Sequence, residues 1–191
     1  MATIASGPLE GLKLAVSQHT SHAHIGGTYE IHTQLAVDRC VKPGFVCYDL
    51  GASIGFLTLV MARKASHVFS FAPAPHAAGE LNKQIAINNF ENVTIVPRPI
   101  SDCDREVQFA LTDVAYGSAI VTNSTKWPTL TLRTMTLDEF THSFPDFVKI
   151  DVDGEEGRVL AGARKNPGTA KGRFLLRAAQ YRGHKASREH S

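Results

Sequence analysis

The feature that most constrains the fold is a glycine-rich turn between an apolar strand and an apolar helix. Residues 45–49 are of strand-forming type, Gly51 and Gly55 follow them, and residues 56–63 have the apolar character of a helix. A strand that enters a helix through such a turn is the first half of a βαβ nucleotide-binding unit. Glycines let a ligand lie against the backbone, where the free N–H groups at the start of the helix point at it.

Asp49, at the end of this strand, bears on which nucleotide would fit. The spacing is Asp-x-Gly-Ala-x-x-Gly rather than Gly-x-Gly-x-x-Gly. An acid in the turn repels a pyrophosphate but suits a ligand that brings an ammonium group or hydroxyls, as S-adenosylmethionine does. A nicotinamide-dependent oxidoreductase is therefore disfavoured. A plain tight turn in an α/β core explains the local pattern equally well.

The rest of the pattern predicts an α/β protein with a doubly wound, mostly parallel sheet. Strands are expected at 45–49, 67–71, 92–96, 145–154 and 174–179, and helices at 29–39, 56–65 and 76–89. In the first of these helices, Ile31, Leu35 and Val37 fit one apolar face. Between 101 and 133 the alternation changes, which predicts an antiparallel pair at 107–111 and 130–133 with a long loop at 113–128. Residues 136–139 have the capping-box pattern of a helix start.

A second informative stretch, residues 145–154, ends in two carboxylates. Alternation places Val148 and Ile150 on one face of the expected strand, and Lys149, Asp151 and Asp153 on the other. The carboxylates then lie at the carboxyl end of a central strand, which is where α/β sheets bind ligands. Ligand-binding or catalytic acids and simple turn-capping acids are both consistent with this position.

Length and charge predict one domain with a polar extension at each end. The chain has 191 residues, and we expect an N-terminal extension at 1–28, a domain at 29–179 and a basic, disordered tail at 180–191. Eight Lys and Arg residues but one acid, Glu189, lie from Arg164 onward. A basic tail can touch nucleic acid or anionic lipid, yet it is more often only solvated, so no nucleic-acid partner is expected.

Cysteine and histidine usage predicts neither a disulfide framework nor a metal site. The three cysteines are odd in number and show no Cys-x-x-Cys spacing. His19, His22 and His24 cluster, but they lack a neighbouring carboxylate or cysteine, so a solvated segment is the simpler interpretation. No signal peptide and no membrane span are recognisable, which makes the cytoplasm the expected compartment.

The ordered set of motifs resembles the FkbM family of S-adenosylmethionine-dependent methyltransferases, which implies a Rossmann-like class I methyltransferase fold. The match runs from about residue 29 to residue 163. It comprises Lys42-Pro-Gly44, Asp49-Leu-Gly-Ala-Ser-Ile-Gly-Phe-Leu-Thr58, Ile87-Asn-Asn89, Val93-Thr-Ile-Val-Pro97, Ile100-Ser-Asp102, Thr136-Leu-Asp138, Lys149-Ile-Asp-Val-Asp-Gly-Glu-Glu156 and Leu160-Ala-Gly-Ala163.

The resemblance implies a role for each matching residue. The cofactor-binding set would be Glu30, Asp49, Gly51, Ala52, Ser53, Gly55, Asp102 and Glu156. Asp102 matches the acid that faces the adenine amine, and Glu30 an acid that closes the cofactor site. Asp151 and Asp153 would line the methyl-transfer pocket and supply the base for transfer to a hydroxyl of a small molecule or sugar. His76 and Lys149 are weaker candidates for that base.

Two departures from the family pattern bear on activity. Ala72 stands where the family has the acid that accepts both ribose hydroxyls, so two charge-assisted hydrogen bonds of roughly 1.5–3 kcal/mol each would be lost. The strands that normally follow the fifth also have no apolar counterpart in this chain. The sequence therefore leaves two hypotheses open: an active O-methyltransferase, and an inactive methyltransferase-like domain that serves as a binding module or is a degenerate fragment.

Overall fold

A five-stranded parallel sheet forms the centre of the computed structural model, which describes residues 1–112, 119–121, 126–164 and 173–176. The strand order is β10-β9-β3-β4-β5, and all four neighbouring pairs are parallel. The strands are β3 (Val46–Leu50), β4 (His67–Phe71), β5 (Val93–Val96), β9 (Phe147–Ile150) and β10 (Arg173–Leu176). The predicted Rossmann-like fold is confirmed. The end of the expected fifth strand, the strands expected to be missing and the basic tail all concern residues outside the described ones.

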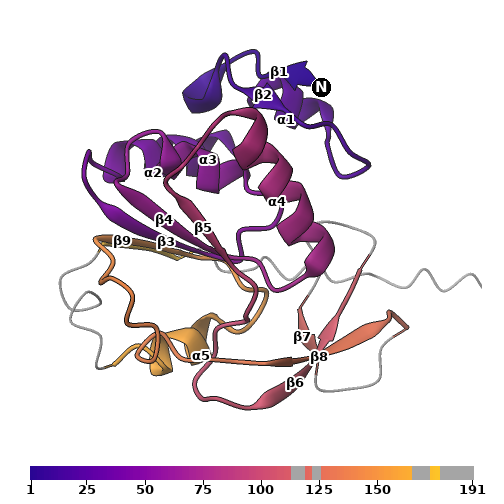
Figure 1. The fold of residues 1–191 in the computed structure, drawn as a ribbon, viewed down its shortest axis with the longest axis vertical. Coiled ribbons are helices and arrows are strands. Elements are labelled where there is room, and N and C mark those ends of the chain that lie inside the picture. The colour runs from indigo at the N-terminus through magenta and orange to yellow at the C-terminus, as the bar shows by residue number, and fades with distance from the viewer. Residues whose placement is uncertain (113–118, 122–125, 165–172, 177–191) are drawn as a thin grey trace, which may run out of the picture.

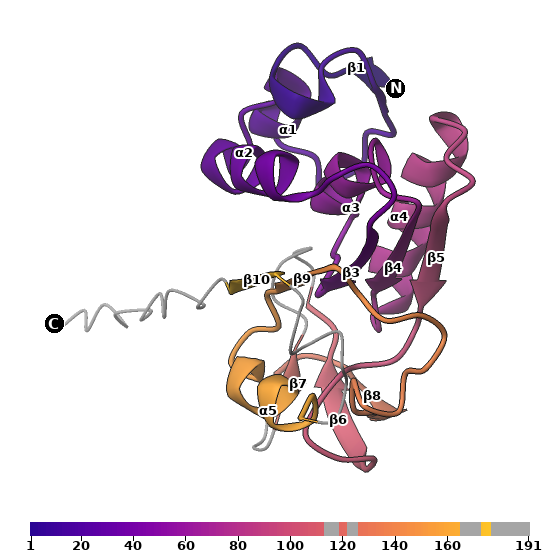
Figure 2. The ribbon, with the colours of Figure 1, turned by 90° about the vertical axis from the view of Figure 1, so that its left-hand side faces the viewer.

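Helices cover both faces of this sheet (Figures 1 and 2). They are α2 (Ile31–Cys40), α3 (Phe56–Ala62), α4 (Pro75–Ile87) and α5 (Glu156–Ala161). On one face, α2 and α3 bury Cys47, Val68 and Phe147. On the other face, Val159 of α5 packs in a cluster with Leu50. The connections β3–α3–β4 and β4–α4–β5 both step in the same direction across the sheet. Right-handed crossovers in the same direction place their helices on the same face, so α3 and α4 share a face.

The alternation predicted for β9 is confirmed. Val148 and Ile150 belong to the cluster on the α5 face, whereas Phe147 belongs to the cluster under α3. All four residues of the strand are buried, Lys149 included. A strand buried on both faces is expected inside a parallel sheet, and it places Lys149 where a charge must find partners.

A second, antiparallel sheet is inserted between β5 and β9. Its strands are β6 (Glu106–Ala110), β7 (Ile120–Val121) and β8 (Thr129–Arg133), in the order β7-β6-β8. The predicted antiparallel pair is confirmed, with Phe109 opposite Leu130. The long loop expected at 113–128 contains β7, while residues 113–118 and 122–125 lie outside the described part of the chain.

The apolar face predicted for the helix at 29–39 is partly wrong. Leu35 is 38% exposed, and the buried residues of α2 are Gln34 and Val37. The side-chain amide of Gln34 donates hydrogen bonds to the carbonyl oxygens of Gly27 (3.0 Å) and Tyr29 (2.5 Å). The buried face of α2 therefore includes Gln34 rather than Leu35, because the Gln34 side-chain amide binds the backbone that leads into the helix.

The capping box at 136–139 forms, but the helix does not. The Thr136 N–H donates to Glu139 Oε2 (2.9 Å), and the Glu139 N–H donates to Thr136 Oγ1 (3.2 Å). The chain makes only one turn there and then buries Phe140 among Tyr48 and Phe71. Packing of this aromatic ring on the sheet takes the place of further helical turns.

The histidine-rich N-terminal region was expected to be solvated, and the structure corrects this. It forms β1 (Ala2–Thr3), a 3₁₀ turn (Gly7–Leu9), β2 (Lys13–Leu14) and α1 (His22–Gly26). Ile4, Leu9 and Leu14 join the core cluster under α3, and His24 is fully buried. Sparse apolar residues at loop positions give no periodicity, so the sequence pattern did not show this packing.

A row of polar side chains on α4 holds part of this region by its backbone. Asn88 both accepts from the Lys13 N–H (2.9 Å) and donates to the Lys13 carbonyl (2.8 Å). Gln84 does the same with Ala15, at 2.9 and 3.0 Å. One turn further, Glu80 accepts from the Ser17 hydroxyl (2.9 Å). We call Glu80, Gln84 and Asn88 the α4 clamp; their spacing of four puts them on one side of the helix.

The clamp predicts that Gln84 matters to stability more than an exposed residue of α4 does. Gln84→Ala removes two hydrogen bonds and leaves the N–H and C=O of Ala15 without those partners, so the free energy of unfolding should fall by about 2 kcal/mol. Urea denaturation of this variant and of Lys83→Ala, an exposed control on the same helix, measures the difference. Equal midpoints for the two variants would contradict a stabilising clamp.

Candidate functional site

The glycine turn after β3 and the end of β9 lie against each other. The N–H groups of Gly51 and Ala52 both donate to the Phe71 carbonyl, at 3.2 and 3.1 Å, which fastens the turn to the end of β4. Gly51 has a φ of 79°, and a Cβ on it would lie 1.9 Å from the carbonyl oxygen of Asp151. Gly51 is therefore needed for the close approach of the β9 backbone, a requirement that is independent of any ligand.

Ser53 of this turn has a left-handed backbone conformation. Four non-glycine residues of the described chain have positive φ: Glu30 (47°), Ser53 (50°), Asn89 (55°) and Asp153 (44°). Asn and Asp tolerate this region, whereas Glu30 and Ser53 adopt it at a cost. Both Glu30 and Ser53 are sequence-predicted site residues, and backbone strain of this kind is typical of functional positions.

Asp49 lies beneath the turn and is fully buried. Its Oδ2 accepts a hydrogen bond from Thr58 Oγ1 at 2.6 Å, and Lys149 Nζ lies 3.0 Å from its Oδ1. Thr58 also contacts Ser70 Oγ at 3.0 Å. Asp49 Oδ2 is thus hydrogen-bonded, whereas within the described part of the chain the buried Oδ1 accepts no hydrogen bond and is balanced by the charge of Lys149 alone. These partners are not apparent from the local sequence pattern, although pairing of the two strands at matching positions would put Asp49 beside Lys149.

Lys149 connects this buried acid to the turn and to Asp151. Its Nζ donates to the Gly51 carbonyl at 2.8 Å and lies 3.9 Å from Asp151 Oδ2. Its side chain is 3% exposed, whereas that of Asp151 is 21% exposed. Of the two predicted catalytic acids, Asp151 is therefore the one that is half-buried beside the turn, and Asp153 is exposed beyond it.

Glu156 acts at the start of α5. Its carboxylate accepts from the Gly154 N–H at 3.1 Å, which fixes the bend between β9 and the helix. An acid in the first helical turn is also favoured by the helix dipole. This local contact does not test the predicted role of Glu156 behind the cofactor, which stays a prediction.

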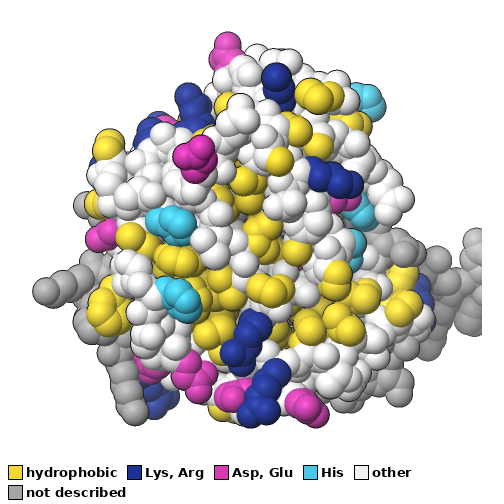
Figure 3. Space-filling view, viewed as in Figure 1, with side chains coloured by type: hydrophobic (Ala, Val, Ile, Leu, Met, Phe, Trp, Pro, Cys, Tyr) yellow, Lys and Arg dark blue, Asp and Glu magenta, His cyan; other side chains and the backbone are white. Residues whose placement is uncertain are grey.

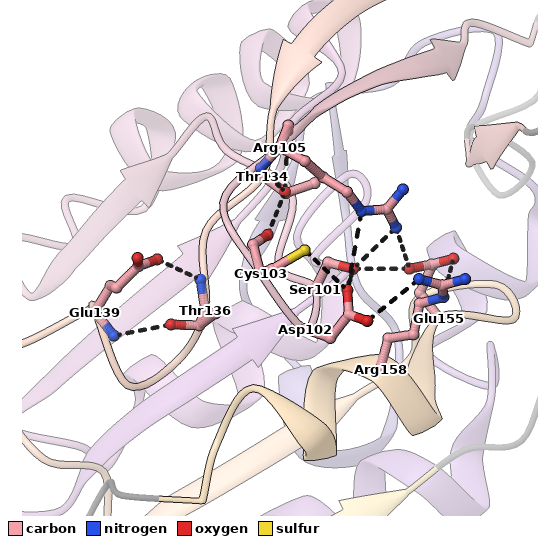
Figure 4. A network of polar contacts seen from close by, with 9 residues as sticks. All are labelled: Ser101, Asp102, Cys103, Arg105, Thr134, Thr136, Glu139, Glu155 and Arg158. Atoms are coloured by element: carbon pink, nitrogen blue, oxygen red, sulfur yellow. Dashed lines mark hydrogen bonds and ion pairs between the residues drawn. The ribbon is translucent and has the colours of Figure 1, made fainter.

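Asp102 belongs to a network of charges between the β5–β6 connection and α5 (Figure 4). Ser101 Oγ lies 3.1 Å from Asp102 Oδ1 and 3.0 Å from Glu155 Oε2, and Arg158 Nη1 lies 3.3 Å from Asp102 Oδ2. Arg105 Nη2 lies 3.8 Å from Glu155 Oε2. These contacts tie the loop that carries Asp102 to the helix after β9, so two of the chain segments around the site are held together.

The network also fixes the ionisation of Asp102. Desolvation opposes the charged form, but hydrogen bonds from Ser101 and from its own backbone N–H, with the charge of Arg158 nearby, hold the pKa of Asp102 below its usual range. The carboxylate is therefore charged at neutral pH and can accept a hydrogen bond from an amine. Its predicted role towards adenine stays a prediction.

The Tyr29–Glu30 pair reaches the turn from the N-terminal side. The ring of Tyr29 stacks on His24 (centroids 4.0 Å apart) and meets the edge of Phe56 (5.7 Å), the residue directly after Gly55. Burial lowers the pKa of His24, and Glu30 opposes this, so the acid lies close enough to His24 to affect it. The structure thus places Tyr29, the neighbour of Glu30, at the start of α3, and the predicted role of Glu30 in closing the cofactor site stays a prediction.

Ala72 follows β4 and is only 2% exposed. It packs in a small apolar cluster with Ala52 of the turn and Leu81 of α4. A Cβ on Gly55 would lie 2.2 Å from Leu81 Cδ1, so α4 approaches the start of α3 closely. Where the family pattern has a sugar-binding acid, this chain has an apolar contact.

Cys47 is not suited to act as a nucleophile. Burial, with Asp146 and Asp49 nearby, raises the pKa of Cys47 to about 12, so its thiol is not a nucleophile at neutral pH.

In the described residues no three His, Cys, Asp or Glu side chains gather in a way that could hold a metal ion. A search of the same residues also finds no helix of the length and apolarity needed to cross a bilayer.

The arrangement of sheet and helices is a Rossmann-like methyltransferase fold, and solved structures agree. This chain is similar to precorrin-6y C5,15-methyltransferase from Geobacter metallireducens (TM-score 0.52, 12% identity, 88% of this chain and 70% of that one). It is also similar to methyltransferase FkbM from Methylobacillus flagellatus (TM-score 0.50, 18% identity, 81% of this chain and 40% of that one). At these identities the likeness shows the fold alone.

The family follows from the sequence match. The family model described as the methyltransferase FkbM domain matches residues 49–175, and the chain belongs to this family. An uncharacterized protein of Methanocaldococcus jannaschii, MJ1452, is 31% identical over 61 residues, which is 32% of this chain and 24% of that protein. The chain thus spans well under two thirds of MJ1452 and of the FkbM structure.

Gly51 should tolerate substitution much less than Gly154, a glycine of equally unusual conformation. Gly51→Ala places a Cβ into the Asp151 carbonyl at a positive φ, and a loss of about 3 kcal/mol or more in unfolding free energy is expected. Gly154 has a φ of 97° but no atom within 4 Å of its Cβ position, so Gly154→Ala should cost only about 1–2 kcal/mol. Chemical denaturation compares them; similar losses would argue against the close approach.

Stability should fall on mild acidification because of His24. Its folded-state pKa is lowered, so it contributes stability that is fully present above the unfolded pKa of about 6.5 and is lost as pH falls towards the folded pKa. Its Nδ1 accepts from the Ser21 N–H (3.1 Å), a bond that protonation of Nδ1 removes. Thermal melts from pH 7.5 to 5 should show a steeper decline for the wild type than for His24→Gln; parallel curves would contradict this.

Proposed function

We propose that the protein is an S-adenosylmethionine-dependent methyltransferase that acts on a hydroxyl of a small molecule or sugar. The observation that carries the proposal is the contact between the glycine turn of β3 and the carboxylate-bearing end of β9, with the Gly51 backbone against that of Asp151. This is the carboxyl edge of the sheet, where parallel α/β folds bind ligands. The family supports methyl transfer; the acceptor class rests on the resemblance and on the acids.

The residues around the turn fit the cofactor in part. Gly51 to Gly55 present backbone at the start of α3, Asp102 is charged, and Tyr29, the residue before Glu30, packs on Phe56 at the start of that helix. Bound here, the cofactor would supply an electrophilic methyl group on a sulfonium. Ala72 does not fit the cofactor, because its side chain cannot accept hydrogen bonds from the ribose hydroxyls.

Asp151 is the better candidate for the base. Transfer to oxygen requires that the acceptor hydroxyl lose its proton, and a carboxylate within hydrogen-bond reach can take it. Asp151 is half-buried beside the turn and near Lys149, whereas Asp153 is exposed. Partial burial shields the proton transfer from water while leaving one side of the carboxylate accessible. Asp151 would hold the acceptor hydroxyl and receive its proton at a carboxylate oxygen.

The acceptor pocket is proposed to include the 113–128 loop. Trp127 is half-buried, with Lys126 Nζ 5.0 Å from its ring centroid, and a ring of this kind can stack on a sugar or aromatic acceptor. Tyr116, another aromatic residue of this stretch of the sequence, lies outside the described residues. A cytoplasmic location and the lack of a nucleic-acid partner remain predictions from composition.

On the described face in Figure 3, acidic and basic side chains are interspersed along the lower edge, below hydrophobic side chains in the centre. Elsewhere on the described surface Arg133 Nε lies 2.6 Å from Asp104 Oδ1, and the hydrogen bond from Arg133 holds the pKa of Asp104 below its usual range. Charges that pair in this way do not give this face a potential of one sign. Nucleic-acid binding would favour a surface of positive potential.

The absence of an acid at Ala72 favours a second candidate function, an inactive methyltransferase-like domain. Calorimetric titration of S-adenosylhomocysteine into the wild type and into Ala72→Glu separates the two. Restoring two charge-assisted hydrogen bonds should tighten binding by roughly 100-fold or more. Measurable binding by the wild type supports the enzyme; binding by the variant alone supports the inactive domain. No heat from the wild type at millimolar ligand would overturn the methyltransferase proposal.

Removing the proposed base should affect turnover far more than binding. Asp151→Asn is expected to lower kcat by roughly 100- to 10,000-fold with little change in cofactor affinity. Asp153→Asn, the matched control two residues on, should retain most of the activity. Transfer of labelled methyl groups to a panel of sugar and phenol hydroxyls provides the measurement. The reverse order of effects would assign the base to Asp153.

A further inference from the structure

The sheet face under α3 changes character abruptly as it nears the turn. Across β9, β3 and β4, Phe147, Cys47 and Val68 stand side by side in an apolar row. Two residues further along the strands, the corresponding row is Lys149, Asp49 and Ser70, and all three are buried.

The fold itself does not require this buried polar row. Desolvation of a buried ion pair often cancels its attraction, so apolar residues of similar size are frequently as stabilising. The preceding apolar row shows that this face can be packed without charge. The buried Asp49–Lys149 ion pair lies directly beneath the proposed ligand-binding turn, so we look for its role in that turn.

The contacts of Lys149 show what that role is. Its ammonium group lies 3.0 Å from Asp49 Oδ1, donates to the Gly51 carbonyl at 2.8 Å and lies 3.4 Å from the Leu50 carbonyl. Asp49 is held in turn by the Thr58 hydroxyl, from the first turns of α3. One cation thus joins β9 to the last residues of β3, to the turn and, through Asp49, to the helix after it.

We propose that Lys149 is a positioning residue that fixes the Asp49–Gly55 turn in the conformation that binds the cofactor, an inference that rests on the proposed function. Asp49 then acts on the cofactor through the turn, since its carboxylate oxygens are already held by Thr58 and Lys149. Lys149 is thereby assigned a role other than that of the base.

The test must separate the position of the turn from general stability. Lys149→Met alone leaves the buried Asp49 carboxylate unpaired and is expected to be strongly destabilising. The double variant Asp49→Leu/Lys149→Met removes both charges and should fold. Leu137→Ala, a substitution of a fully buried residue in the cluster on the opposite face of the sheet, controls for a loss of stability that arises outside the Lys149 contacts.

Amide hydrogen exchange of the ligand-free protein is the first measurement. The N–H groups of Gly51, Ala52 and Gly55 are hydrogen-bonded, so they should exchange slowly in the wild type and at least 10-fold faster in the double variant, but not in Leu137→Ala. Wild-type exchange at these amides in the double variant would overturn the proposal. If the double variant does not fold, Asp49→Asn/Lys149→Met, which also removes both charges but keeps the size of the Asp49 side chain, is measured in its place, and unchanged exchange at these amides would likewise overturn the proposal.

Titration with S-adenosylhomocysteine is the second measurement. The double variant should bind at least 10-fold more weakly than the wild type, and Leu137→Ala within about two-fold of it. Equal affinity of the double variant and the wild type would overturn the link to the cofactor. Failure of the wild type to bind would instead refute the proposed function, while the exchange data would still decide whether Lys149 fixes the turn.

Discussion

The approach of the β3 turn to the end of β9 is the constraint on which the rest of the site depends. Gly51 has no room for a side chain because the Asp151 carbonyl occupies that space. The same approach lets Lys149 reach both the turn and the buried Asp49. The parallel pairing of β3 and β9 produces this close approach, with Asp49 opposite Lys149 and Leu50 opposite Ile150. A shift of one residue in this register would turn Lys149 to the opposite face and separate the two halves of the site.

Most of the parallel sheet could be predicted because its strands carry strong local signals. The strand at 67–71 matches β4 at both ends, and the helix predicted at 76–89 differs from α4 by a residue or two at each end. Pro75 at the first position of α4 explains that start. At the site, alternation placed Lys149 on the correct side of β9, beside Asp49, since a strand has a fixed period of two.

What could not be predicted depends on partners distant in the sequence. Gln34 reads as a polar surface residue, yet it is buried because its amide meets the carbonyls of Gly27 and Tyr29. The capping box at Thr136 forms without a helix because Phe140 packs on the sheet. Likewise, the ion pair of Asp49 and Lys149 joins residues that are 100 positions apart, and only the strand order brings them together.

The α4 clamp separates the positions of this region that can change freely from those that cannot. Asn88 and Gln84 bind the peptide groups of Lys13 and Ala15, not their side chains. Side-chain substitutions at Lys13 and Ala15 therefore leave the attachment intact, whereas Leu14 between them is fixed by its burial in the core. The backbone of this segment is thus held by the helix, and its sequence is constrained only where a side chain enters the core.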